Sequence, residues 1–157
     1  MTPVFRLIAL SFALWLTACV PLPPATTLVG PLPPQPPGTA RLVFYRTLEY
    51  YDTTAMSTVY LNGTAAGVSQ VGAVLYRDVP AGRYDLSVFS PRPYPDQFKT
   101  VVVKAGDVFY VRIDALPKQS CGRFTAADAC YADTFIVVVV DPAIGSQQIQ
   151  GLRLITG

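Results

Sequence analysis

Histidine is absent from this 157-residue sequence, and charged residues make up only 14% of it. Without an imidazole, the chain cannot assemble a Ser–His–Asp or Cys–His nucleophile, or a metal site built on histidine ligands. Lys and Arg number 12 against 10 Asp and Glu, and they are scattered singly, so no basic stripe is available to neutralise phosphates. We therefore expect no catalytic residues, no metal, no cofactor and no nucleic-acid partner.

Hydrophobic residues, in contrast, make up 51% of the chain, which is typical of a folded, strand-rich protein. Once a leader and a linker are set aside, about 115 residues remain, which is enough for one hydrophobic core. The sequence therefore predicts a single domain over residues 40–157.

The amino terminus has the pattern of a secretory signal peptide, because Arg6 gives a positive end and residues 7–16 are almost wholly apolar. An apolar run of about ten residues is half of what a bilayer-spanning helix needs. The next motif, Leu16-Thr17-Ala18-Cys19, resembles the lipobox of bacterial lipoproteins. The resemblance implies that residues 1–18 are removed and that Cys19 carries a diacylglycerol and an N-acyl chain, a durable membrane anchor.

Residue 20 bears on which membrane holds this anchor. In the enterobacterial scheme that the lipobox implies, an aspartate after the cysteine marks retention in the inner membrane, and this chain has Val20 there. We therefore expect the protein in the cell envelope, at the periplasmic face of the outer membrane rather than at the inner membrane.

Residues 19–39 contain the lipid-carrying cysteine and an uncharged, proline-rich linker. Its prolines occupy positions 21, 23, 24, 31, 33, 34, 36 and 37. This density of proline predicts no packed element and favours polyproline II at about 3.1 Å per residue, which would hold the domain up to roughly 50 Å from the lipid. A second interpretation makes Pro-Leu-Pro-Pro a ligand for an aromatic groove.

The domain shows short apolar segments separated by turns. Strands are predicted at 40–46, 58–61, 64–68, 73–79, 83–89, 98–103, 108–114, 135–140 and 151–156. Asn62-Gly63 predicts a two-residue hairpin, and the turn at 105–107 predicts a second hairpin. The β-branched run 135–140 predicts a central strand, and 151–156 a last edge strand. The spacing predicts an all-β fold, an antiparallel two-sheet β-sandwich, with a partly open β-barrel as the alternative.

Four of these turn-and-strand segments are similar to a known family. Residues 40–46, 59–63 followed by Gly67, 79–86 and 105–112 resemble the bacterial domain of unknown function 2846 family. The resemblance covers roughly residues 40–114 and implies a small envelope protein, since most members carry a lipobox. It implies no catalytic residues, because none are established for that family.

Two cysteines remain once Cys19 carries lipid. Cys121 and Cys130 form an even pair in an oxidising compartment, so we expect a disulfide that orders the long loop 115–134. A reactive thiol pair or a metal site is the alternative.

Aromatic and charged residues in three loops are candidates for binding a partner, because tyrosine offers a large rigid area with a polar tip. The candidate residues are Tyr50, Tyr51, Arg92, Tyr94, Arg123, Phe124 and Tyr131. Ordinary loop packing is the alternative for each of them.

Together these observations predict a non-enzymatic, lipid-anchored binding or assembly module whose partner is another envelope protein or a cell-wall component. One alternative is a subunit of a trans-envelope secretion or transport complex. Another is a cell-wall hydrolase or its inhibitor.

Overall fold

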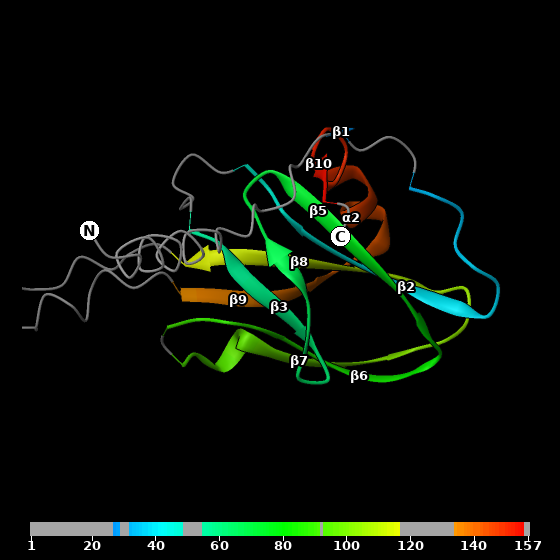
Figure 1. Cartoon of the computed structure of the whole chain (residues 1–157), viewed down its shortest axis with the longest axis horizontal. Helices are drawn as coiled ribbons and strands as arrows, with labels where there is room; N and C mark the ends of the chain where they lie inside the picture. The colour runs from blue at the N-terminus through cyan, green and yellow to red at the C-terminus, as the bar shows by residue number, and fades with distance from the viewer. Residues whose placement is uncertain (1–26, 29–31, 49–54, 92, 117–133, 156–157) are drawn as a thin grey trace, which may run out of the picture.

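The computed structural model describes residues 27–28, 32–48, 55–91, 93–116 and 134–155. Their strands form two sheets that pack face to face (Figure 1). Sheet A has the strand order β1-β10-β5-β2-β8-β9, and sheet B has the order β4-β3-β6-β7. The two-sheet sandwich predicted from the sequence is confirmed, and the described strands do not join into the partly open barrel that was the alternative.

Sheet A contains β1 (Thr27–Leu28), β2 (Thr39–Arg46), β5 (Ala73–Pro80), β8 (Val108–Leu116), β9 (Thr134–Val140) and β10 (Arg153–Leu154). Sheet B contains β3 (Ser57–Leu61), β4 (Thr64–Ser69), β6 (Gly82–Val88) and β7 (Phe98–Val103). A 3-10 helix, η1 (Pro95–Gln97), precedes β7, and a short helix, α2 (Pro142–Gln148), follows β9.

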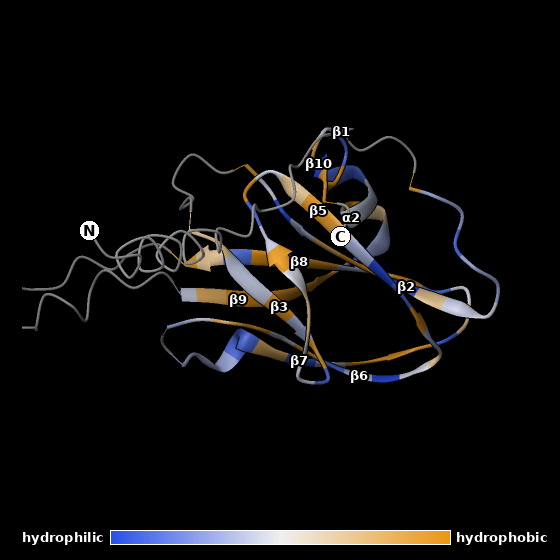
Figure 2. Ribbon diagram, in the orientation of Figure 1, coloured by the Kyte–Doolittle hydropathy of each residue, from blue (hydrophilic) through white to orange (hydrophobic). Residues whose placement is uncertain are grey.

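The main core lies between the two sheets, because alternate residues of each strand point inward. Its fully buried members include Leu42, Phe44, Val59, Leu86 and Val111. Strands β8 and β9 are hydrophobic over much of their length, whereas β6 shows hydrophilic positions (Figure 2). A second, smaller cluster lies on the outer face of sheet A, beneath α2, and is made by Val43, Tyr45, Val74, Ile149 and Leu152.

The sheets are not wholly antiparallel, which corrects one part of the sequence prediction. Strand β2 pairs in parallel with β8, and β10 pairs in parallel with β5. A parallel pair needs a long crossover connection. Here the connection from β2 to β8 passes through β3 and β4 in sheet B, β5 in sheet A, and β6 and β7 in sheet B. After it, β8 runs in the same direction as β2.

One predicted hairpin is confirmed and the other is wrong. Asn62 and Gly63 have φ of 48° and 77° and join β3 to β4 as adjacent antiparallel strands. The turn at 105–107 exists, but it connects β7 in sheet B to β8 in sheet A. Its backbone is bonded to the start of β2, since the Gly106 N–H donates to the Thr39 carbonyl at 2.8 Å and the Arg41 N–H to the Asp107 carbonyl at 2.8 Å. This clamp directs β8 alongside β2 instead of back along β7.

Two predicted strand positions are also wrong. In the described part of the chain, β9 pairs with β8 alone and so lies at the edge of sheet A, not at its centre. Its apolar run reflects burial of Phe135 and Val137 in the core and of Val140 against the outer cluster. The last strand, β10, lies between β1 and β5 and is not an edge.

The proline-rich linker was predicted to contain no packed element, and this is wrong for its described residues. Thr27 and Leu28 form β1, which pairs with β10 at the edge of sheet A. Leu32 packs against the outer cluster of sheet A, and the carbonyls of Pro33 and Pro34 accept hydrogen bonds from Arg41. The linker therefore joins the domain well before residue 39.

Candidate functional site

Residues that flank three predicted contact loops meet at one end of the sandwich. Arg46, at the end of β2, donates from Nη1 to the carbonyl of Ala55 at 2.7 Å, and its guanidinium lies 5.0 Å from the ring centroid of Phe135. The Phe135 N–H donates to Ser90 Oγ at 3.2 Å. We call this region, where Arg46, Ala55, Ser90 and Phe135 meet, the loop end.

Arg46 holds the loop end together from inside. Its side chain is 1% exposed, and it follows Ala40, Leu42 and Phe44 on the inward face of β2. A buried cation is tolerated only where its donors are satisfied, and a guanidinium can donate to carbonyls in its plane while stacking on an aromatic ring. Arg46 does both, so it links β2 to the starts of β3 and β9.

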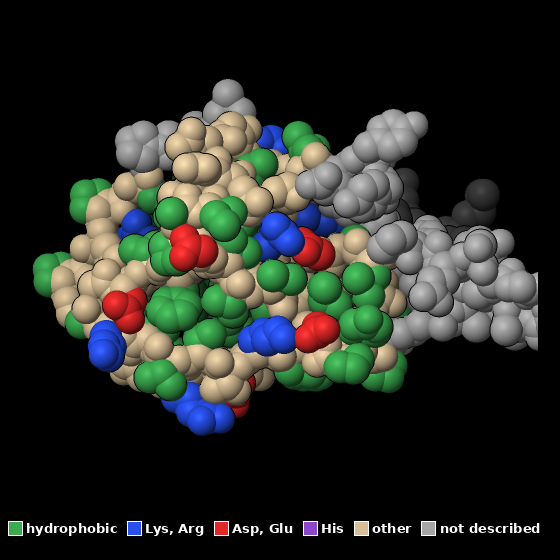
Figure 3. Space-filling model, turned by 180° about the vertical axis from the view of Figure 1, so that it is seen from behind, with side chains coloured by type: hydrophobic (Ala, Val, Ile, Leu, Met, Phe, Trp, Pro, Cys, Tyr) green, Lys and Arg blue, Asp and Glu red, His purple; other side chains and the backbone are tan. Residues whose placement is uncertain are grey.

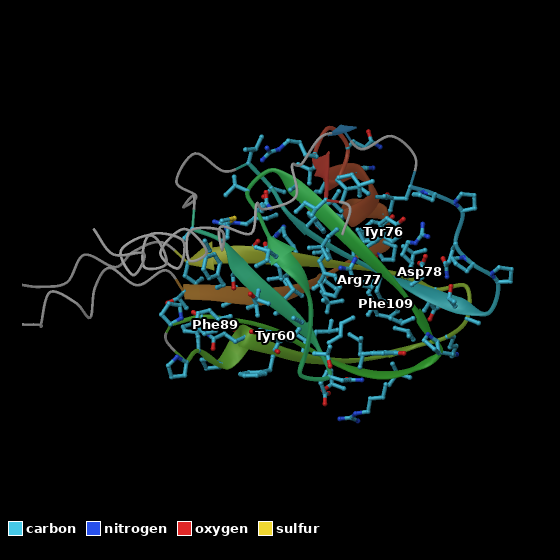
Figure 4. The ribbon with its side chains drawn as sticks, viewed as in Figure 1. Tyr60, Tyr76, Arg77, Asp78, Phe89 and Phe109 are labelled. Carbon is cyan, nitrogen blue, oxygen red and sulfur yellow. The ribbon has the colours of Figure 1, made fainter. Side chains whose placement is uncertain are left out.

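Beside the loop end, the outer face of sheet B exposes several large apolar side chains. Tyr60 in β3 lies opposite Ser87 in β6, and Ser87 lies opposite Phe98 in β7. Phe89 follows two residues after Ser87 and donates its N–H to the Thr58 carbonyl at 2.8 Å, which places it next to the same row. Figure 4 shows Tyr60 and Phe89 close together on sheet B.

The exposure of these residues is large. Phe98 is 67% exposed, Phe89 57% and Met56, just before β3, 47%, while Tyr60 is half-buried. We call these four residues the apolar patch. Tyr94, in the turn that enters η1, is 42% exposed and adds a further aromatic side chain to the chain segment leading to Phe98. These residues form a group of exposed, mainly apolar side chains on this side of the domain.

Polar groups next to the patch are paired. Thr100 Oγ1 donates to Asp85 Oδ1 at 2.6 Å on the outer face of sheet B, and Lys99 pairs with Asp96 at 2.8 Å. Away from the patch, on sheet A, Arg112 forms a two-pronged pair with Asp114 at 2.7 and 2.9 Å. Figure 3 shows, on the side turned away from the view of Figure 1, exposed hydrophobic side chains beside pairs of oppositely charged side chains. Lys99 and Asp96 thus neutralise each other, whereas Asp85 is hydrogen-bonded to an uncharged hydroxyl.

Two residues of β2 in sheet A have shifted pKa values, and both make hydrogen bonds that hold the fold together. Burial raises the pKa of Tyr45, whose hydroxyl donates to Gln148 Oε1 of α2 at 2.5 Å. The hydrogen bond to Asp78 raises the pKa of the Arg41 guanidinium.

In the ranges that the structure describes, no group of three or more His, Cys, Asp or Glu side chains is placed to hold a metal ion. Over the same ranges, no helix has the length and hydropathy needed to cross a bilayer.

Of the candidate contact residues predicted from the sequence, Tyr94 is described, and its side chain is exposed. The other predicted site residues lie outside the described part of the chain. They are the lipobox residues Leu16, Thr17, Ala18 and Cys19, the cysteines Cys121 and Cys130, and the loop residues Tyr50, Tyr51, Arg92, Arg123, Phe124 and Tyr131.

The apolar patch was not predicted, although one signal for it was present. Residues 83, 85 and 87 alternate on the polar face of their strand, and Phe89 continues the same alternation. The alternation thus predicts that Phe89 lies on the solvent side of its strand. The contributions of Met56 and Phe98 depend on how β3, β6 and β7 align, which the local pattern does not give.

Comparison with known proteins identifies a family. Residues 36–122, more than half of the chain, match the sequence profile of a family described as "Protein of unknown function (DUF2846)". No curated protein matches the chain. The matched range runs from the end of the proline-rich segment through β2 to β8, and so includes Tyr60, Phe89 and Phe98 of the patch. The chain belongs to the DUF2846 family.

Proposed function

We propose that the protein is a lipid-anchored module at the periplasmic face of the outer membrane, that it binds another envelope protein, and that it catalyses no reaction. The observation that carries this proposal is the exposure of Met56, Phe89 and Phe98 together on one face of a sandwich whose core is otherwise closed. Such an exposed group is costly in a periplasm crowded with other proteins unless a partner covers it.

The chemistry of the patch fits a protein partner. Phe89 and Phe98 offer large rigid areas at a low cost in side-chain entropy, Met56 adapts to the shape of its partner, and Tyr60 adds a polar tip. The ion pair of Lys99 with Asp96 lies next to Phe98 in the chain, and Asp85 accepts a hydrogen bond from Thr100 on the same face. Polar groups of this kind are found at the rim of protein–protein interfaces. A carbohydrate of the cell wall would instead call for several unpaired polar groups around an aromatic platform.

The amino terminus supports the location. A positive end, ten apolar residues and the motif ending at Cys19 are the signals that direct a bacterial chain to lipidation, and Val20 favours the outer membrane. Two or three acyl chains on Cys19 would hold the domain permanently at the membrane. Permanent anchoring raises the effective concentration of the patch toward partners in the same membrane.

Photo-crosslinking in living cells tests the proposal. A photoreactive phenylalanine derivative at position 98 keeps the aromatic character of the patch, and one at Ile144 provides a matched control. Ile144 is 52% exposed, but it lies on α2 over the opposite sheet. We expect one or two recurring envelope proteins on position 98 and none of them on position 144.

A second substitution shows whether the adducts depend on the patch. Phe89→Ser should reduce the adducts at position 98 about tenfold, the effect of losing roughly 1.4 kcal/mol at an aromatic contact, while Ile144→Ser should leave them unchanged. Recovery of cell-wall fragments alone, or equal adducts in Phe89→Ser, would refute binding of a protein at the patch. Unchanged membrane fractionation of Cys19→Ala would refute the anchor.

A further inference from the structure

The proline-rich segment contacts its own domain at both of its ends. Thr27 and Leu28 pair with Leu154 and Arg153 in β10. Farther along, residues 32–38 lie against the outer face and end of sheet A: Leu32 packs on the outer cluster, and Gln35 Nε2 donates to the Thr39 carbonyl at 2.5 Å. We call residues 27–28 and 32–38 the strap.

Arg41 is the main contact for the strap. Its Nη1 donates to the Pro33 carbonyl at 2.5 Å, and Nη2 lies 3.5 Å from the Pro34 carbonyl. Proline has no N–H to donate, so a proline-rich segment is bound through its carbonyls and its ring surfaces. A guanidinium provides several donors in fixed directions, and it suits this task better than an ammonium does.

The surroundings of Arg41 keep the guanidinium in place. Its side chain is 5% exposed, and Nε and Nη2 donate to the two carboxylate oxygens of Asp78 at 2.7 and 2.8 Å. The guanidinium also lies 4.4 Å from the ring centroid of Tyr76. Both partners come from β5, next to β2 (Figure 4). The buried charge is thus compensated within the domain, which leaves Nη1 free to bind the strap.

We propose that Arg41, Tyr76 and Asp78 form a binding site for the proline-rich segment of their own chain, and that this site sets the distance and the orientation of the domain at the membrane. The second half of the statement rests on the proposed anchor at Cys19. The contacts in the structure identify the segment that occupies the site. The carbonyls of Pro33 and Pro34 accept hydrogen bonds from Arg41, and Leu32 packs against the outer cluster, as Tyr76 does.

The strap shortens the reach of the linker. Eight residue steps separate Cys19 from Thr27, so a fully extended chain spans at most about 29 Å from the lipid to β1. A free linker of polyproline II would span roughly 50 Å over residues 21–38 alone. The strap also joins the domain at the β1–β10 edge of sheet A. The apolar patch lies on the outer face of the other sheet, so a strapped domain is held by one layer and presents the other to a partner.

Energy transfer between the domain and a bilayer tests the strap. The lipidated full-length protein carries a fluorescent amino acid at Gln150, an exposed position just after α2, and is reconstituted in phospholipid vesicles with acceptor lipids. The double variant Leu32→Asp, Gln35→Ala removes strap contacts without altering residues of the sandwich. β1 makes only two residue pairs with β10, which are too few to persist once residues 32–38 detach. We therefore expect the mean distance from label to bilayer to increase by at least about 20 Å in this variant, the least difference between the two reaches.

The control is Pro37→Ala, which changes an exposed proline of the same segment and should leave the distance unchanged. An unchanged distance in the double variant would overturn the strap. Wild-type protein that does not bind vesicles would overturn the anchor only, because hydrogen exchange in solution tests the strap independently. The amides of Thr27 and Thr39 should exchange at least tenfold faster in the double variant, and equal exchange rates would contradict the proposal.

Discussion

The outer faces of the two sheets have the same alternating pattern but different surroundings. On sheet A, Tyr45 and Val74 are buried beneath α2 and the strap, with exposures of 1% and 0%. On sheet B, Phe98 and Val102 are 67% and 65% exposed in the structure as described. The cover of sheet A comes from segments before β2 and after β9. The terminal parts of the chain thus cover one face of the sandwich, while the described residues leave apolar side chains of the other face exposed.

Truncating one aromatic residue on each face gives the largest expected effect. Tyr45→Ala should lower the free energy of unfolding by about 3–5 kcal/mol, because it opens a cavity beneath α2. Phe98→Ala should change it by less than about 0.5 kcal/mol, since its ring is already in water. Urea unfolding of the purified protein measures both. A large loss for Phe98→Ala would mean that the patch belongs to the core and would remove the basis for a partner.

The contact between α2 and sheet A gives the next effect. A Cβ at Gly145 would lie 2.4 Å from Cβ and Cγ of Tyr110, which are close to the backbone and cannot swing away. Gly145→Ala should therefore displace α2 and cost about 1–3 kcal/mol, even though alanine favours helix. Gln147→Ala, at an exposed position of the same helix, is the control and should stay within about 0.5 kcal/mol. Equal stabilities would show that α2 is not packed on Tyr110.

The strands could be predicted from the sequence because their information is local. The predicted segment 98–103 coincides with β7, and 73–79 and 83–89 match β5 and β6 to within a residue at each end. Each shows an apolar run or an alternation bounded by a turn, and Asn62-Gly63 has the positive φ that its turn requires. Apolar runs, alternation and turn residues depend only on neighbours in the chain. The strands that they predict are therefore found in the folded protein.

Sheet membership could not be predicted, because it depends on residues far apart in the chain. The turn at 105–107 has the residues of a hairpin turn, and only its bonds to Thr39 and Arg41 direct β8 into the other sheet. The edge position of β9 likewise depends on which strands it is hydrogen-bonded to. A strand buried on both faces has the same apolar run whether it lies at the edge or at the centre of a sheet. The apolar patch depends on the same long-range alignment, and so only Phe89 left a signal in the sequence.

The smallest expected effect concerns the hydroxyl that ties β2 to α2. Tyr45 donates to Gln148 Oε1, and burial raises its pKa above the ordinary value of 10.0. Below pH 10 the folded and unfolded chains both keep this proton, so the full contribution is present. As the pH rises above 10, the unfolded chain releases the proton first, and stability falls by at most about 1.4 kcal/mol per pH unit until the folded protein also titrates.

Tyr45→Phe should cost about 1 kcal/mol at neutral pH and remove this part of the alkaline slope. Tyr94→Phe, at an exposed site, is the control for urea unfolding between pH 7 and 11. An alkaline slope that is the same in wild type and Tyr45→Phe would show that water reaches this hydroxyl on the covered face of sheet A. The two outer faces would then not differ in how well they exclude water.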